Sequence, residues 1–503
     1  MTLDAKTLPL LALLTAMALM GCADDGSAPS DAGSQTDAGS QTDAGGGEET
    51  RSYNFDSRFV DGSSVVYTGQ TARLVILEEM MSFIGDLEEA LQAGTIEVNE
   101  AGDLIPFIDF YFRFDSDSDG EEALTLSFPL PLLQETFNAI SAGKDLVGKL
   151  AGNDPVTDHR VWTGEESEFS GWADASIAAD GGDITSPEGL FVAFASTLDA
   201  HALAATEGTD RLGPGGEVLP VTITESGIDL EQMMEKFLIG ALTLSQGADD
   251  YMDDDVDGKG LRASHDGPAS DGDPYTALEH AWDEAFGYFG AARDYLAYTD
   301  EEIAGKGGRE DYADGSHDYD GDGRIDLNAE ANFVLAVNAA KRDRGAVIPT
   351  DFTADAMNAF LDGRQLLADT AGPLSEAQLQ ELTGYRDQAL LAWEGALAAT
   401  VIHYVNDTLQ VMNTFGTDDY DFTEHAKVWS EMKGFALGFQ FNPHSPLLAD
   451  FDEIHSLFGD APVLADGAVD AYRADLIAAR ALIGAAYGFA TENLGDANGE
   501  NGW

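Results

Sequence analysis

One acidic stretch of this sequence has the spacing of a calcium-binding loop, with acids at alternate positions and then a glycine: Asp318, Asp320, Asp322, Gly323, Arg324 and Asp326. In EF-hand-type loops, positions one, three and five bind Ca²⁺ through side chains. Position seven binds through its carbonyl oxygen, and position nine binds directly or through water. The twelfth position should carry a bidentate acid; here it is Ala329, and Glu330 follows. The sequence therefore predicts structural Ca²⁺ held by Asp318, Asp320, Asp322, the Arg324 carbonyl, Asp326 and Glu330. The plain alternative is an acidic turn between helices.

Two other stretches share only the opening of this pattern. They are Asp253, Asp255, Asp257 and Gly258, and Asp115, Asp117, Asp119 and Gly120. Their ninth positions are Leu261 and Ala123, so the later acid is missing. In a chain this acidic, we expect these stretches to be turns rather than ion sites.

A second constellation lies on a predicted helix and contains His280, Asp283 and Glu284. Residues four apart on a helix share a face, so His280 and Glu284 could both bind one ion, with Asp283 close by. Imidazole and carboxylate ligands suit iron or zinc. The alternative is an ion-paired histidine in the first turns of a helix. Further ligands could come from later helices, at Glu394, His403, His425 and Glu431.

Motifs of catalysis are weak in this sequence. Ser430 and Lys433 have the Ser-x-x-Lys spacing, but they lie in an ordinary helical pattern without the partner motifs. With 92 acidic residues, no pair of carboxylates can be assigned as general acid and base from spacing alone. The sequence does not favour an enzyme, and its catalytic residues stay unknown.

Helical periodicity dominates the chain and predicts an all-α, bundle-like domain. Apolar residues recur at steps of three and four over 74–91, 186–205, 229–247, 274–297, 328–343, 352–370, 375–415, 422–440 and 468–492. Asp351 or Thr353 could cap the helix over 352–370, and Ser375 precedes the longest one. Strand-like stretches near Val65, over 105–114 and over 218–224 predict a small irregular or β element toward the N-terminus. We expect a division near residue 220, between helical parts at 51–220 and 221–503.

The N-terminus has the features of a bacterial lipoprotein signal over residues 1–21. A short apolar run from Leu8 to Met20 ends in Leu19-Met20-Gly21-Cys22, and Cys22 is the single cysteine of the chain. An apolar run this short fits a signal peptide better than a membrane span. Residues 22–50 repeat Asp-Ala-Gly-Ser-Gln-Thr without large apolar side chains, which predicts a flexible linker. We therefore expect lipidation of Cys22 and a place in the cell envelope, on the outer membrane, facing the periplasm or the surface.

The net charge of −67 limits which classes of partner the protein can bind. Such a field repels nucleic acid and anionic lipid surfaces, so we expect no nucleic-acid partner and attachment to the membrane only through the lipid. Most of the acids are expected to form a solvated surface. No protein partner can be assigned.

Three segments of the chain resemble a bacterial lipoprotein family known as domain of unknown function 4856. They begin at Ser63, His280 and Trp429 and read SSVVYTGQTAR, HAWDEAFGYF and WSEMKGFALGF. The resemblance implies a helical surface lipoprotein, distantly similar to the imelysin-like proteins, which are associated with iron uptake. The imelysin hallmark is Gly-x-His-x-x-Glu, but this chain has Leu278 and Asp283 at its first and last positions. What carries over is a candidate metal site near His280.

The sequence thus favours a surface-anchored, cation-binding helical lipoprotein. Calcium would be structural, and iron or zinc would point to metal acquisition. The alternatives are a metal-dependent hydrolase or peptidase, and an adhesion or scaffold module with purely structural ions.

Overall fold

The computed structural model describes residues 50–153, 156–173, 177 and 184–503. Cys22, the signal sequence and nearly all of the linker therefore lie outside the described residues. The described part is mostly helical and has no β-strand, only isolated bridges such as Asp56 with Ser63. The expected all-α fold is confirmed. The division near residue 220 stays a prediction.

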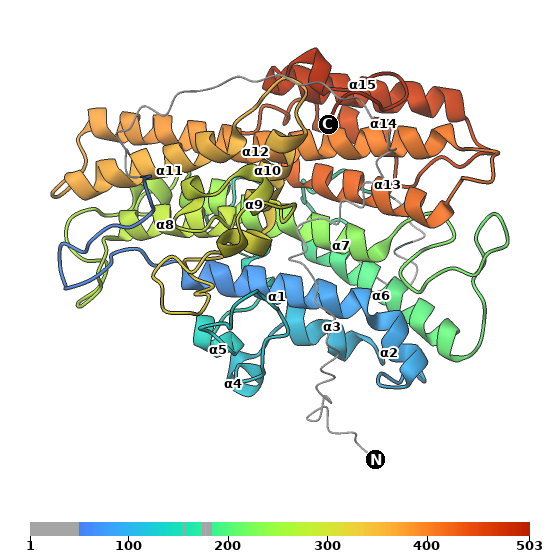
Figure 1. The fold of residues 1–503 in the computed structure, drawn as a ribbon, viewed down its shortest axis with the longest axis horizontal. Coiled ribbons are helices and arrows are strands. Elements are labelled where there is room, and N and C mark those ends of the chain that lie inside the picture. The colour runs from blue at the N-terminus through green and yellow to red at the C-terminus, as the bar shows by residue number, and fades with distance from the viewer. Residues whose placement is uncertain (1–49, 154–155, 174–176, 178–183) are drawn as a thin grey trace.

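The helices up to residue 262 form the lower part of the molecule in Figure 1. They are α1 (Thr68–Gly85), α2 (Leu87–Ala93), α3 (Ile105–Phe112), α4 (Ser116–Asp119), α5 (Phe137–Ile140), η1 (Val147–Lys149), α6 (Pro187–Thr206), α7 (Leu230–Leu238), the π-helix η2 (Ile239–Tyr251) and η3 (Gly260–Arg262).

The rest of the chain supplies the longer helices. They are α8 (Ala277–Phe289), η4 (Tyr295–Ala297), α9 (Asp300–Ile303), η5 (Glu310–Gly315), α10 (Val334–Gly345), α11 (Phe352–Asp369), α12 (Glu376–Asn413), α13 (Phe422–Leu437), η6 (Gly438–Phe441), α14 (Phe451–Phe458), α15 (Val469–Tyr487) and η7 (Thr491–Asn493). The long α12 runs across the molecule and contacts α10, α11, α13 and α15 (Figure 1).

Capping side chains fix where the long helices begin. The Asp351 carboxylate accepts the backbone N–H of Ala354 at the start of α11. Thr276 with Glu279, and Ser375 with Gln378, form capping boxes at α8 and α12. Each cap satisfies backbone N–H groups that have no partner inside the helix.

The strand expected over residues 105–114 is wrong, because these residues form α3. Pro106 lies in the first turn, where its missing N–H costs no hydrogen bond. Ile108 and Phe112, four residues apart, are both buried, and α3 packs on α1 and α6. The aromatic run looked strand-like, but its buried positions follow the helical period.

The π-helix η2 owes its position to a close approach between two glycines. A Cβ on Gly240 would lie 2.4 Å from the Cα of Gly438, so η2 and the end of α13 meet backbone to backbone. All described residues of η2 except Tyr251 are buried. Long π-helices are rare, and π-turns occur frequently at functional sites.

One described helix, α6, is long and apolar enough to cross a membrane by length and composition. Half of its apolar window is buried inside the protein. It packs against α2, α3 and α7, as a core helix does.

Candidate metal centres

The loop over residues 318–330 is shaped by the first aspartate of the predicted calcium motif. The Asp318 carboxylate accepts the N–H groups of Gly321, Asp322 and Gly323 at 2.8, 3.0 and 2.9 Å. Gly321 and Gly323 have φ values of 76° and 86°, which favour glycine. An antiparallel bridge between Ser316 and Ala331 closes the loop at its base.

Three carboxylates of this loop converge. Asp318, Asp320 and Glu330 each offer an oxygen, and these oxygens lie within 4.8 Å of one another. Glu330 is 3% exposed, and burial raises its pKa. Its two oxygens accept the N–H groups of Tyr319, Asp320 and Asp326. The glutamate one residue past the usual position thus reaches the same space as the first two acids.

The other expected ligands make different contacts. Asp322 accepts the N–H of Arg324 at 2.8 Å. Asp326 accepts from the Gln134 side chain at 2.7 Å and from the N–H of Asn328 at 2.9 Å. The Arg324 side chain pairs with Glu135. As calcium ligands, Asp322, Asp326 and the Arg324 carbonyl stay predictions.

The His280 constellation is only partly assembled. His280 Nε2 lies 3.7 Å from Glu284 Oε1, and its ring stacks on Tyr275. Asp283 is fully buried and accepts hydrogen bonds from Tyr53 and Arg364, both at 2.8 Å. Because the Asp283 carboxylate already pairs with the buried Arg364, its contacts are those of a structural residue. Iron or zinc at His280 and Glu284 stays a prediction.

The four acids and histidines on later helices make separate contacts. The Glu394 carboxylate accepts hydrogen bonds from Asn442, Ser445 and Tyr487. The His403 ring lies 3.2 Å from the Asp407 carboxylate, and the His425 ring lies 3.2 Å from the Tyr420 hydroxyl. The Glu431 carboxylate accepts a hydrogen bond from the Tyr404 hydroxyl at 2.9 Å. The Ser430 hydroxyl accepts the N–H of Asp229 at 2.8 Å, and the Lys433 ammonium donates to Gly459 and Asp460.

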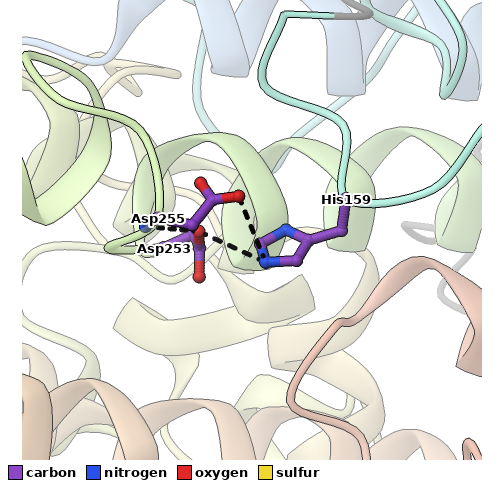
Figure 2. A group of neighbouring side chains, drawn as sticks. All are labelled: His159, Asp253 and Asp255. Atoms are coloured by element: carbon purple, nitrogen blue, oxygen red, sulfur yellow. Dashed lines mark hydrogen bonds and ion pairs between the residues drawn. The ribbon is translucent and has the colours of Figure 1, made fainter.

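A third cluster forms where η2 ends, and sequence spacing did not assign it. His159 comes from the segment between η1 and α6, and Asp253 and Asp255 follow η2. His159 Nε2 lies 3.5 Å from Asp253 Oδ2 and 3.5 Å from Asp255 Oδ2. Figure 2 shows the imidazole facing both carboxylates. The three ligand atoms lie within 4.8 Å of one another.

Neighbouring side chains orient this cluster. The Asp249 carboxylate contacts His159 Nδ1 and also accepts the backbone N–H of His159 at 3.1 Å. His444 Nε2 lies 3.1 Å from Asp253 Oδ1. The N–H of Asp255 donates to Asp253 Oδ2 at 2.9 Å. Asp249 thus orients His159, and His444 and the backbone of Asp255 orient Asp253.

The turn below the cluster depends on Gly260. Its φ is +48°, and a Cβ there would lie 2.3 Å from the Asp253 carbonyl oxygen. This close approach forms one wall of a small hollow lined by Thr157, Asp249, Asp250, Asp253, Asp255, Val256, Lys259 and Gly260. Pockets for small molecules usually enclose roughly 300–1,000 Å³, and the packed side chains of this hollow leave no such space for an organic substrate.

The charged groups of the cluster shift one another's pKa values. The hydrogen bond to Asp249 raises the pKa of His159 to about 9. Burial acts to raise the pKa of Asp253, but hydrogen bonds from His444 and Asp255 outweigh it, and that pKa lies below its ordinary value. The contact with Asp253 raises the pKa of Asp255. The hollow is thus a place where positive charge is favoured.

Two of the three residues of this cluster belong to a motif of the sequence. Asp253 and Asp255 open the calcium-like stretch that begins at Asp253, whereas Asp257 of that stretch pairs with Arg262. His159 lies far upstream in a stretch without helical period, and no local signal marks it. In the other calcium-like stretch, which begins at Asp115, the Asp115 carboxylate caps the short helix α4 by accepting the N–H of Asp117.

Comparison with known proteins identifies one region. Residues 193–306 match a family model described as Domain of unknown function (DUF4856). No curated protein and no solved structure matches the chain. The matched region contains η2, Asp249, Asp253, Asp255 and His280, whereas His159 and the loop over 318–330 lie outside it. Over residues 193–306 the chain is therefore similar to DUF4856, a domain family of unknown function.

Proposed function

We propose that this protein is a cell-envelope lipoprotein whose helical part binds cations, with a structural Ca²⁺ ion in the loop over residues 318–330. The observation that carries the proposal is the convergence of Asp318, Asp320 and Glu330 oxygens within 4.8 Å. Carboxylate oxygens are the preferred ligands of Ca²⁺. Three carboxylates this close repel one another unless a cation or a proton compensates them.

The contacts of the loop indicate what calcium would do. Ile325 pairs with the backbone at Pro131 and Leu133, at 2.9 and 2.8 Å. Gln134 contacts Asp326 and Leu327, and the Tyr319 hydroxyl lies 3.5 Å from Ser52. An ion that orders this loop would therefore also order the segments around residues 52 and 131–134. The proposed role is structural: it joins the start of the helical part to the region before α10.

Calcium is expected to raise the thermal stability of the full chain in detergent. Saturation at about 100 times Kd adds about 2.7 kcal/mol to the free energy of unfolding. The measurement is a series of thermal melts across calcium concentrations up to several millimolar, each compared with a chelator. Asp318→Asn and Glu330→Gln should lose most of the calcium-dependent shift.

A matched control is Asp117→Asn, in the acidic stretch over 115–120 that forms the short helix α4, and this variant should keep the whole shift. Melting that is indifferent to calcium in the unmodified chain would sink the proposed site. An equal loss in Asp117→Asn would show that calcium acts through general charge screening.

The envelope setting rests on the lipoprotein signal that ends at Cys22. Ala23 after the cysteine favours the outer membrane, and the likeness to imelysin-like proteins favours metal handling there. In fractionated bacterial cells, the unmodified chain should sediment with membranes and be released by detergent but not by salt. Cys22→Ser should remove incorporation of a labelled fatty acid and move the chain out of the membrane fraction. Unchanged labelling of Cys22→Ser would contradict the anchor.

A further inference from the structure

We propose a second cation site, distinct from the calcium loop, in which His159, Asp253 and Asp255 bind a divalent transition-metal ion such as Zn²⁺ or Fe²⁺. The inference does not depend on calcium binding at 318–330. It moves the expected transition metal from His280 to the end of η2.

The spacing of the three ligand atoms fits an ion. Zinc lies roughly 2.0–2.2 Å from nitrogen and carboxylate ligands, so two ligands at tetrahedral angles are roughly 3.4 Å apart. His159 Nε2 lies 3.5 Å from each carboxylate oxygen. The nitrogen is thus already at the separation from both oxygens that a bound ion would require, and the ligand atoms of all three residues lie within 4.8 Å of one another.

The histidine is oriented as metal-bound histidines are. In protein metal sites the second ring nitrogen commonly donates to a carboxylate, which fixes the ring and leaves the other nitrogen for the ion. Asp249 contacts His159 Nδ1 and also holds its backbone N–H. Nε2 is therefore directed at Asp253 and Asp255, as Figure 2 shows.

The carboxylates are also held in place. His444 lies 3.1 Å from Oδ1 of Asp253, which leaves Oδ2 on the side of His159. Arg386 in turn contacts both His444, at 3.0 Å, and the Met252 carbonyl, at 2.8 Å. Asp255 is 46% exposed in its side chain and forms the open side of the site. An ion can thus enter from solvent without opening the core.

The ligand types separate this site from the first one. Calcium prefers ligand sets made only of oxygen, as in the loop over 318–330. A set with one imidazole nitrogen and two carboxylates suits Zn²⁺ and Fe²⁺, and a solvent-facing position would remain for water or a further ligand. The competing arrangement has no metal: an imidazolium on His159 would neutralise the surrounding carboxylates.

The test is binding of Zn²⁺ to the full, chelator-treated chain in detergent, measured by calorimetry with calcium saturating. Co²⁺ absorption spectra would report the coordination. We expect one tight site per chain. His159→Gln and Asp255→Asn should each weaken it at least about tenfold. Because Asp255 is half exposed, Asp255→Asn should fold even if the histidine variant does not.

Two controls make the result specific. Asp257→Asn, two residues along the same turn, and Glu330→Gln in the calcium loop should bind Zn²⁺ as the unmodified chain does. Zinc binding that is absent, or unchanged in Asp255→Asn, would overturn the site in favour of the imidazolium. Binding lost in His280→Ala but kept in His159→Gln would overturn it in favour of the other constellation. The zinc titrations can be interpreted even if calcium has no effect on the melting temperature, because the two sites share no ligand.

Discussion

Replacing Arg364 with alanine should destabilise the protein by about 3–5 kcal/mol, the cost of breaking a buried ion pair by removing one partner. The Arg364 side chain is fully buried on α11. It donates to Asp283 at 2.8 Å, to Glu279 at 3.3 Å and to the Ser64 hydroxyl at 2.6 Å. Without it, the buried Asp283 carboxylate on α8 loses its ion-pair partner, while Glu279 keeps its ion pair with Arg58 at 3.0 Å. Burial already acts to raise the pKa of Asp283, and Arg364 opposes that effect.

The measurement is urea unfolding of the unmodified chain and the variant in calcium. The control is Arg113→Ala, at the C-cap of α3, because the ion pairs of Arg113 with Asp109 and Glu188 are solvent-exposed. Exposed pairs are worth about 0–1 kcal/mol, so this variant should unfold almost as the unmodified chain does. Arg364→Lys should fall between the two, because an ammonium keeps the charge but not the planar fork. Equal, small losses in both alanine variants would contradict the role given to Arg364.

The positions of the helices could be predicted because their signals are local. Periodicity over 186–205, 352–370 and 375–415 corresponds to α6, α11 and α12, within a few residues at each end. Asp351 was one of two candidates for a cap, and it caps α11. In these stretches the capping residue and the apolar face lie within the segment itself. No information from distant parts of the chain is needed.

The aromatic run over 105–114 misled because its residue types and its period disagree. Phenylalanine, tyrosine and isoleucine favour strands. Among the described residues, however, no strand lies beside this segment to pair with it. The partners of this segment are helices α1 and α6. Tertiary packing overrode the local preference.

The candidate sites divide in the same way. The calcium loop is a single segment, so its spacing could be read directly, although which acids converge could not. The spacing on α8 puts Asp283 near His280, but its ion pair with Arg364 comes from α11 and cannot be predicted from that spacing. The cluster at His159 depends on the approach of the segment after η1 to the end of η2. The spacing of residues within one segment cannot predict a contact between two distant segments.

The pH dependence of stability should carry a distinct contribution from Glu394. This carboxyl group is fully buried on α12. Burial raises its pKa from 4.5 to about 7, although hydrogen bonds from Ser445, Tyr487 and Asn442 act in the other direction. The folded protein thus holds the proton of Glu394 more tightly than the unfolded chain does. The favourable contribution is fully present below about pH 4.5 and is lost as the pH rises to about 7.

Glu394→Gln should remove this contribution, because glutamine stays neutral at every pH. One pKa unit corresponds to about 1.4 kcal/mol, so the effect across this interval is on the order of 3 kcal/mol. The variant should therefore gain stability relative to the unmodified chain between pH 5 and pH 8. Urea unfolding at several pH values in saturating calcium gives the difference in free energy of unfolding between the variant and the unmodified chain. The contributions of the other acids cancel in that difference. Glu381→Gln, at an exposed position of the same helix, should show no such trend. A difference that is flat with pH for Glu394→Gln would mean that the buried carboxylate stays ionised, stabilised by its three hydrogen bonds.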